Sequence, residues 1–334
     1  MKPIQFKIYH AQLALAIMCL SACASLSKSQ LNEVNGFGRL TKNFSAYPSK
    51  VVSSYNQAHQ QIELYRANSL PTPDAHFEAI LQANRFKQKS DLITPKIDLS
   101  LQIINQYAQA LIALTADQHV AALDTASTGL GKHIEGLVDQ YNALETEHPL
   151  PSGAGGVIGK LVSFGGGVYI RARQAKIVRQ LVPEADPVIG ILCDRLITFL
   201  EPPAATLPGR KSLQELIVYE QEQLKLNYTR FLGLNRDLVN LRYGRDTSRL
   251  TGSIVNQRFA LLSDDKSCLQ LMENLDQTET LRTQCITAIR DLRKVHSQLV
   301  KDLEKKKDIE ELVAEVQYYR DHMQQLNTTL KAIK

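Results

Sequence analysis

The last part of the chain contains neither glycine nor proline from Ser253 to Lys334, so nothing there strongly disfavours a helix. Residues 278–334 are expected to form one helix of roughly 85 Å, at 1.5 Å per residue. The charged residues 304–308 interrupt its apolar stripe, and they are interpreted either as a surface turn or as a solvated section. The stripe has apolar residues mainly three or four positions apart: Ile289, Leu292, Val295, Leu299, Leu303, Ile309, Leu312, Val316, Met323, Leu326 and Leu330.

Helical periodicity also runs through most of the chain from residue 50, and no convincing strand alternation appears. Leucines recur every seventh position from Leu123 to Leu144, which is typical of helix packing. The chain is therefore predicted to be all-α, an elongated bundle of seven or eight helices with long C-terminal ones. The expected helices cover about residues 50–70, 73–89, 95–111, 117–145, 168–182, a short segment after Pro187 to Leu200, and 210–243.

A glycine-rich apolar centre, residues 149–208, separates possible halves at residues 50–148 and 209–334. Within it, segment 153–170 leaves two interpretations open. The first is a hairpin tip that inserts into a bilayer, and the second is a buried turn where helices cross closely. Lys160 and the density of glycine and proline favour the second. The glycines concerned are Gly155, Gly156, Gly159, Gly165, Gly166 and Gly167.

The N-terminus has the layout of a secretory signal peptide over residues 1–22. Lys2 and Lys7 precede an apolar core that is too short to span a bilayer stably. The following Leu20-Ser21-Ala22-Cys23 resembles the lipobox of bacterial lipoproteins. That resemblance implies cleavage before Cys23 and acylation of Cys23 by diacylglycerol and often by a further chain such as palmitate.

The residue that follows the lipobox cysteine is Ala24 and not an aspartate. In enteric bacteria this implies forwarding to the outer membrane, with the chain held at its periplasmic face. Residues 23–49 are polar and are expected to form a flexible, lipid-anchored tether.

Three cysteines remain after Cys19 leaves with the signal and Cys23 is acylated. Cys268 and Cys285 flank a polar stretch, and one hypothesis joins them in a disulfide across a helix-turn-helix corner. The alternative is two separate buried thiols. Cys193 lies in an apolar run and is expected to be a small buried residue.

Motifs for catalysis, metals and cofactors are weak. Residues 154–160 resemble a phosphate-binding loop, but Leu161 stands where Ser or Thr would bind Mg²⁺. The histidines are scattered without metal-ligand spacing, and no G-x-S-x-G occurs. No cofactor, metal or catalytic residue is therefore expected. The net charge of +5 falls to +3 without Lys2 and Lys7, which is too small to favour nucleic acid.

These observations favour a non-enzymatic envelope lipoprotein that acts as a helical scaffold or interaction module. The membrane contact is the N-terminal lipid, and the expected partner is another envelope protein that meets a helix face. Two alternatives stay open. One is a membrane-active bundle that inserts segment 153–170, and the other is an enzyme or ligand binder whose site is assembled across helices.

Overall fold

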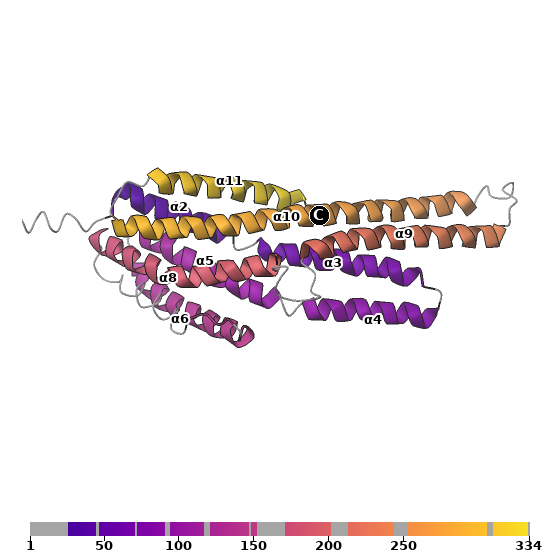
Figure 1. Ribbon diagram of the computed structural model, residues 1–334, viewed down its shortest axis with the longest axis horizontal. Coiled ribbons are helices and arrows are strands. Elements are labelled where there is room, and N and C mark those ends of the chain that lie inside the picture. The colour runs from indigo at the N-terminus through magenta and orange to yellow at the C-terminus, as the bar shows by residue number, and fades with distance from the viewer. Residues whose placement is uncertain are drawn as a thin grey trace, which may run out of the picture. The chain divides into compact units, whose positions relative to one another are not determined.

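The described residues form α-helices and no strand, which confirms the all-α prediction (Figure 1). The computed structural model describes residues 26–44, 47–70, 72–90, 94–116, 121–146, 148–151, 171–201, 213–243, 253–305 and 310–332. The signal peptide, Cys23 and segment 153–170 lie outside these residues.

The chain divides into two compact units, and each is assembled from three separate stretches. Unit 1 comprises residues 1–45, 99–193 and 291–320, and unit 2 comprises residues 46–98, 194–290 and 321–334. This division differs from the expected halves at 50–148 and 209–334. The sequence suggested a boundary at its glycine-rich centre, whereas helices α5 (Thr94–Thr115), α8 (Arg171–Leu200), α10 (Ser253–Lys305) and α11 (Glu310–Ala332) each contribute to both units.

Unit 1 begins with α2 (Lys28–Phe44), which lies within the stretch expected to be a flexible tether. The tether prediction is wrong for these residues because α2 is amphipathic and buries one face. The buried face of α2 contains Leu31, Val34, Phe37, Thr41 and Phe44, which are spaced by three or four positions.

A capping box marks the start of α2. The Ser27 backbone N–H donates to Gln30 Oε1 at 2.9 Å, and the Gln30 backbone N–H donates to Ser27 Oγ at 3.1 Å. Each side chain thus satisfies a backbone donor that the first helical turn leaves open. The Ser-x-x-Gln pattern is visible in the sequence, so this helix start was recognisable.

The rest of unit 1 packs apolar faces of several helices around a common core. Besides α2 it uses α6 (Ala121–Leu144), which runs through Gly129, Gly131 and Gly136 without a break. Further fully buried side chains come from the other two stretches of the unit: Ile103, Ile104, Tyr107, Leu111, Ile134, Tyr141, Val178, Leu181, Leu192, Cys193, Leu292, Val295 and Tyr319. The burial of Cys193 confirms its expected place in the core.

Unit 2 is organised around α3 (Pro48–Asn68), which packs on both α4 (Pro73–Ser90) and α9 (Leu213–Tyr243). The expected starts of these helices are close to those observed. At α4 the Ala75 backbone N–H donates to Thr72 Oγ1 at 3.3 Å, and Pro73 occupies the first helical position. The core of the unit includes Val51, Tyr55, Ala58, Ile62, Leu196, Leu200, Ile217, Leu224, Leu271, Leu275, Leu281, Cys285 and Ile289.

Helix α8 replaces the two helices expected on either side of Pro183 and Pro187. Both prolines lie inside the helix, although each removes a backbone donor and crowds the preceding turn. Val182, Ala185 and Ile189 are buried around them, so packing on the core holds the helix through the weakened turns.

The C-terminal helices are also divided differently from the expectation. Helix α10 begins at Ser253, passes through Asp264 and Asp265, and ends at Lys305, and α11 begins at Glu310. One helix over residues 278–334 is therefore wrong. Of the four residues between the helices, Lys306, Lys307 and Asp308 belong to the charged patch, and only Ile309 belongs to the apolar stripe.

The expected disulfide between Cys268 and Cys285 is also wrong. Both cysteines lie on α10, and 17 positions of helix separate their Cα atoms by about 25 Å. A disulfide requires Cα atoms within about 7 Å. Both thiols are free and buried, as the alternative hypothesis had it, and burial raises the pKa of each.

The two glycines of α2 give a matched test of its packing. A methyl group at Gly38 would lie 3.0 Å from the Ala108 carbonyl oxygen of α5, whereas one at Gly36 would meet nothing within 4 Å. We expect Gly38→Ala to lower the free energy of unfolding by about 1–2 kcal/mol through overpacking. Gly36→Ala should raise it by about 0.5–1 kcal/mol through helix propensity. Denaturant unfolding measures both, and equal effects of the two would contradict docking of α2 on α5.

Candidate functional site

Unit 2 buries a histidine–carboxylate pair between α3 and α9. His59 Nδ1 lies 2.6 Å from Glu220 Oε1, and Glu220 is only 2% exposed. The Tyr55 ring stacks against the His59 ring, with 6.2 Å between centroids. Burial first, and then the Glu220 carboxylate, raise the pKa of Tyr55 far above its ordinary value.

Such a cluster contains the groups used in general acid–base catalysis, but its position favours a structural role. Tyr55 and Glu220 are both buried, so a substrate would have to part α3 from α9 to reach them. The cluster instead pairs a carboxylate that would be costly to bury alone. It thereby fixes the register of α3 on α9.

Unit 1 contains a second buried histidine–carboxylate cluster, formed by Asp186 of α8, His296 of α10 and Tyr107 of α5. We call this cluster the buried relay of unit 1. His296 Nδ1 lies 2.8 Å from Asp186 Oδ1, and its Nε2 lies 2.8 Å from the Tyr107 hydroxyl oxygen. Because an ionised carboxylate only accepts, the Nδ1–H of His296 donates to Asp186, which leaves Nε2 as the ring atom that meets the tyrosine hydroxyl. The ring of Phe37 packs against His296 at 5.9 Å between centroids, so four helices meet there.

The order carboxylate, imidazole, hydroxyl is that of a catalytic triad, but the hydroxyl is inaccessible. Tyr107 is 1% exposed, and burial raises its pKa well above the ordinary value, with Asp186 adding to the effect. The proton therefore stays on Tyr107. Only Asp186, at the other end, is half-exposed.

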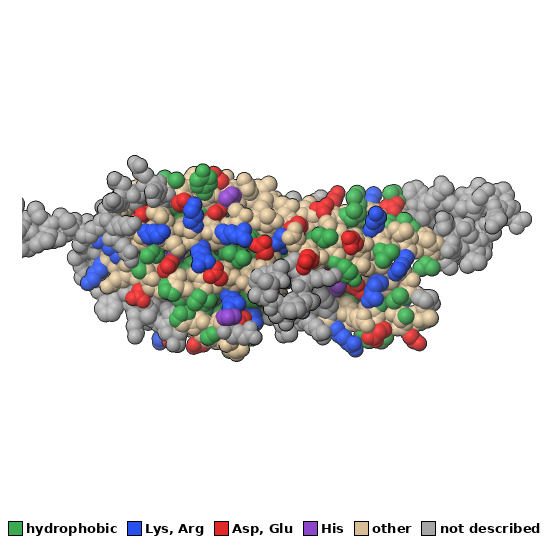
Figure 2. Space-filling view, viewed as in Figure 1, with side chains coloured by type: hydrophobic (Ala, Val, Ile, Leu, Met, Phe, Trp, Pro, Cys, Tyr) green, Lys and Arg blue, Asp and Glu red, His purple; other side chains and the backbone are tan. Residues whose placement is uncertain are grey.

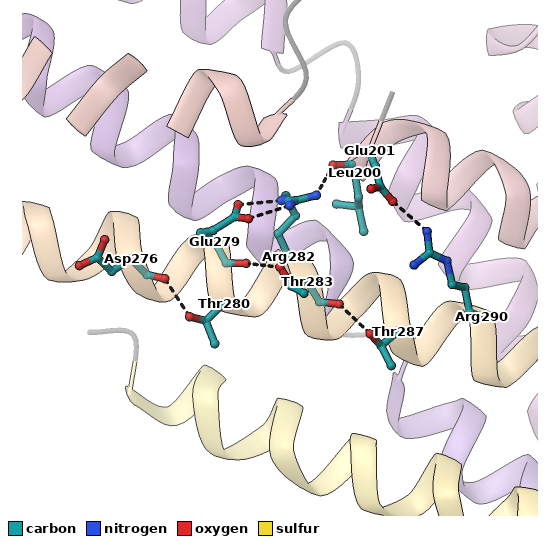
Figure 3. Close-up of polar contacts among 9 residues, drawn as sticks. All are labelled: Leu200, Glu201, Asp276, Glu279, Thr280, Arg282, Thr283, Thr287 and Arg290. Carbon is teal, nitrogen blue, oxygen red and sulfur yellow. Dashed lines mark hydrogen bonds and ion pairs between the residues drawn. The ribbon is translucent and has the colours of Figure 1, made fainter. Parts of the chain in front are cut away.

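Unit 2 also contains a buried arginine that binds the end of α8 (Figure 3). Arg282 of α10 donates from Nε and Nη2 to the two carboxylate oxygens of Glu279, at 2.7 and 2.6 Å. Its Nη1 donates to the Leu200 carbonyl at 3.3 Å. A cation at a helix C-terminus opposes the partial negative charge there, so Arg282 caps α8. Arg290 donates to Glu201 at 2.9 Å, one residue beyond that end.

A polar cavity of about 310 Å³ opens between α3 and α10, within unit 2. Its walls combine five carboxamide side chains with two leucines, one tyrosine and one serine. The lining residues are Gln57, Gln61, Leu64, Tyr65 and Asn68 of α3, and Ser267, Gln270, Leu271 and Asn274 of α10.

Exposed apolar side chains flank the contact between α9 and α10. Gln221 donates to Asp276 at 2.6 Å, and the Tyr228 hydroxyl donates to Asp265, so the two helices run antiparallel here. Apolar residues three or four positions from these four share the same helix faces. We call them the apolar strip: Val218 and Leu232 of α9, and Leu262, Leu269 and Met272 of α10, each between 38% and 58% exposed.

The surface in Figure 2 shows how hydrophobic side chains stand among charged ones on the face in view. Isolated exposed leucines are ordinary on a protein surface. The apolar strip differs because its members follow two neighbouring helices in register. Apolar side chains gathered in this way are typical of contact surfaces.

The expected site residues fall mainly outside the described part of the chain. This applies to Cys23, to the glycines of segment 153–170 and to the loop at residues 154–160. Within the described ranges, no three His, Cys, Asp or Glu side chains are grouped to hold a metal ion. No helix in those ranges is both long and apolar enough to cross a membrane.

The buried relay of unit 1 predicts a pH dependence. The hydrogen bond that Asp186 accepts from His296 lowers the pKa of the Asp186 carboxyl below its ordinary value, although burial alone would raise it. A lowered folded-state pKa stabilises the fold above the unfolded pKa, and this stabilisation is lost as the pH falls through about 4 and below. We therefore expect the free energy of unfolding to fall more steeply between about pH 5 and pH 3 in the wild type than in Asp186→Asn.

Urea unfolding across that pH range measures the difference. Asp194→Asn is a suitable control, since Asp194 is an exposed aspartate on the same helix, whereas His296 Nδ1 pairs with Asp186. Parallel curves for the wild type and Asp186→Asn would contradict the role of the relay.

Comparison with protein-family models, with curated proteins and with solved structures finds no match to this chain.

Proposed function

We propose that this chain is a lipid-anchored envelope protein that serves as a non-enzymatic helical interaction module. Acyl chains on Cys23 hold it at the periplasmic face of the outer membrane. Its apolar strip receives an amphipathic helix of a second envelope protein. The observation that carries this proposal is the exposure of five apolar side chains in register along α9 and α10.

The form of the apolar strip favours a helix as its occupant. Val218 and Leu232 are 14 positions apart on α9, which corresponds to about 21 Å. That length accommodates about four turns of a partner helix. Side chains at positions i, i+3, i+4 and i+7 of such a helix would meet the strip, as in other helix-in-groove contacts.

The polar groups beside the apolar strip support the same occupant. Asp265 and Asp276 already bind Tyr228 and Gln221, so α9 and α10 are held together without a partner. A docking helix therefore meets a surface formed beforehand, and little ordering of the strip's backbone is needed on binding.

The lipid anchor is supported by the signal layout and by Leu20-Ser21-Ala22-Cys23. A single acyl chain gives only marginal attachment, at about 0.8 kcal/mol per buried CH₂ group, and two or three chains make attachment stable. With α2 beginning at Lys28, only a few residues separate Cys23 from the first described helix. The acyl chains would therefore be attached close in sequence to α2, the first described helix of unit 1.

In-cell photo-crosslinking tests the partner surface. Photoreactive residues at Leu262 and Leu269 should capture the same envelope protein, and Leu232→Glu should reduce capture about tenfold or more because it places a charge against the bound helix. The crosslinked positions in the partner should be about seven residues apart, as expected for a helix that follows the strip.

Gln82 of α4, an exposed residue outside the apolar strip, provides the matched control for the crosslinker. Equal capture from Gln82 and from the strip positions would count against the proposed surface. Crosslinks to lipid alone would assign the strip to the membrane instead and would overturn the helix partner.

The anchor has its own test. In cells fed an alkyne-labelled fatty acid, the wild-type chain should acquire the label and fractionate with the outer membrane. Cys23→Ala should lose the label because no thiol remains at the position where the lipobox directs acylation. Cys193→Ala should retain it, because that buried thiol is not part of the lipobox. Labelling that persists in Cys23→Ala would refute the anchor.

A further inference from the structure

The cavity between α3 and α10 uses a different face of α10 from the apolar strip. On α3 its lining residues Gln57, Gln61, Leu64 and Asn68 recur at spacings of four, three and four, so they form one stripe along that helix. The opposite wall comes from one stretch of α10, residues 267–274. We infer that this cavity binds an uncharged saccharide.

The first argument is the hydrogen-bonding capacity of the walls. Each of the five carboxamides offers two N–H donors and one carbonyl acceptor. Within the described part of the chain, none of these amide groups is engaged by another side chain or by the backbone. A sugar hydroxyl both donates and accepts, so vicinal hydroxyls match a carboxamide at both of its ends.

The second argument is the charge of the cavity. Among the described residues that line it, none is Asp, Glu, Lys, Arg or His. A phosphate, carboxylate or ammonium group would lose water there without meeting an opposite charge, which is costly. Neutral polar ligands carry no such penalty, so the walls select against nucleotides, phospholipid headgroups and acidic sugars.

The third argument is the fixed apolar part of the walls. Leu271 is buried, and Leu64 is exposed beside it as a second apolar contact. The Tyr65 ring packs edge-on against Tyr228 and Phe231, at 5.7 and 6.0 Å between centroids, and its hydroxyl lies 3.5 Å from the Asp264 carbonyl. These contacts hold the ring in place. Apolar surface of this kind suits the C–H faces of a sugar ring, which a purely polar groove would leave unmatched.

The size of the cavity limits the ligand to a short segment. A volume of about 310 Å³ lies at the lower end of the range for small-molecule sites. Because the cavity is open, a longer glycan can extend beyond it. Carboxamide walls also suit acetamido groups, so plain and N-acetylated sugars share the recognising chemistry and have to be separated by experiment.

Isothermal titration of the detergent-solubilised full chain with maltotriose and with chitotriose tests the inference. We expect at least one of the two to bind, and Gln61→Ala/Gln270→Ala to weaken that binding by about tenfold or more, because one carboxamide is lost from each wall. Binding of chitotriose alone would identify acetamido recognition, whereas binding of both would identify recognition through hydroxyls.

The control variant is Gln82→Ala, which removes an exposed carboxamide outside the cavity and should leave the affinity unchanged. Circular dichroism checks that the double variant is folded. If it is not, Gln61→Ala alone takes its place, and we expect this single variant to bind the sugar about fivefold more weakly. Binding of neither sugar, equal binding by the double variant, or stronger binding of glucose 6-phosphate than of both trisaccharides would overturn the inference. None of these results bears on the apolar strip, since Leu232 and Leu269 do not line the cavity.

Discussion

The apolar stripe of α10 runs from Cys268 to Leu303, with a buried residue at almost every third or fourth position, and both units use part of it. Residues up to Arg290 belong to unit 2 and those from Asp291 to unit 1. Burial of such a stripe is the main favourable contribution to helix packing, since the intrinsic preference of an isolated helix is small. The registers of the helices that pack on α10 follow from this stripe.

Polar residues at a few positions of the same helix specify these registers further. Arg282 meets Glu279 and the Leu200 carbonyl, and His296 meets Asp186 and Tyr107. A slip of one helical turn would leave the His296 ring and the Leu200 carbonyl without these partners, at about 1–3 kcal/mol for each buried polar group left unsatisfied, while Arg282 would keep Glu279 on its own helix. Apolar contacts tolerate such a slip much better, so the polar groups account for the uniqueness of the packing.

Much of the helix layout was predictable because the period of 3.6 is local. Pro48, Pro73 and Pro95 lie in the first turns of α3, α4 and α5, close to the expected boundaries. The predictions that were wrong failed because of contacts in the tertiary structure. Helix α2 looked like a tether because its polar face dominates the composition, and α8 survives Pro183 and Pro187 because its other side is buried.

The polar networks and surfaces were beyond sequence reasoning. His59 and Glu220 are separated by 161 positions, and His296 and Asp186 by 110, so no spacing rule could pair them. The apolar strip was hidden for another reason. Leu269 and Met272 resemble core leucine and methionine in a helical pattern, and only their exposure distinguishes them from Leu271 and Leu275. Periodicity identifies the faces of a helix, but which face is covered depends on the neighbours.

The interleaving of the two units has a consequence for biosynthesis. Unit 1 needs residues 1–45 together with residues 291–320, and unit 2 needs residues 46–98 together with residues 194–290. During translation α2 can pack on α5 and α3 on α4 early, but α10, which contributes residues to both units, emerges only about 200 residues after α2 and α3. Contacts of such high sequence separation slow folding and prolong the exposure of apolar faces. We therefore expect neither unit to complete its core before α10 has been made.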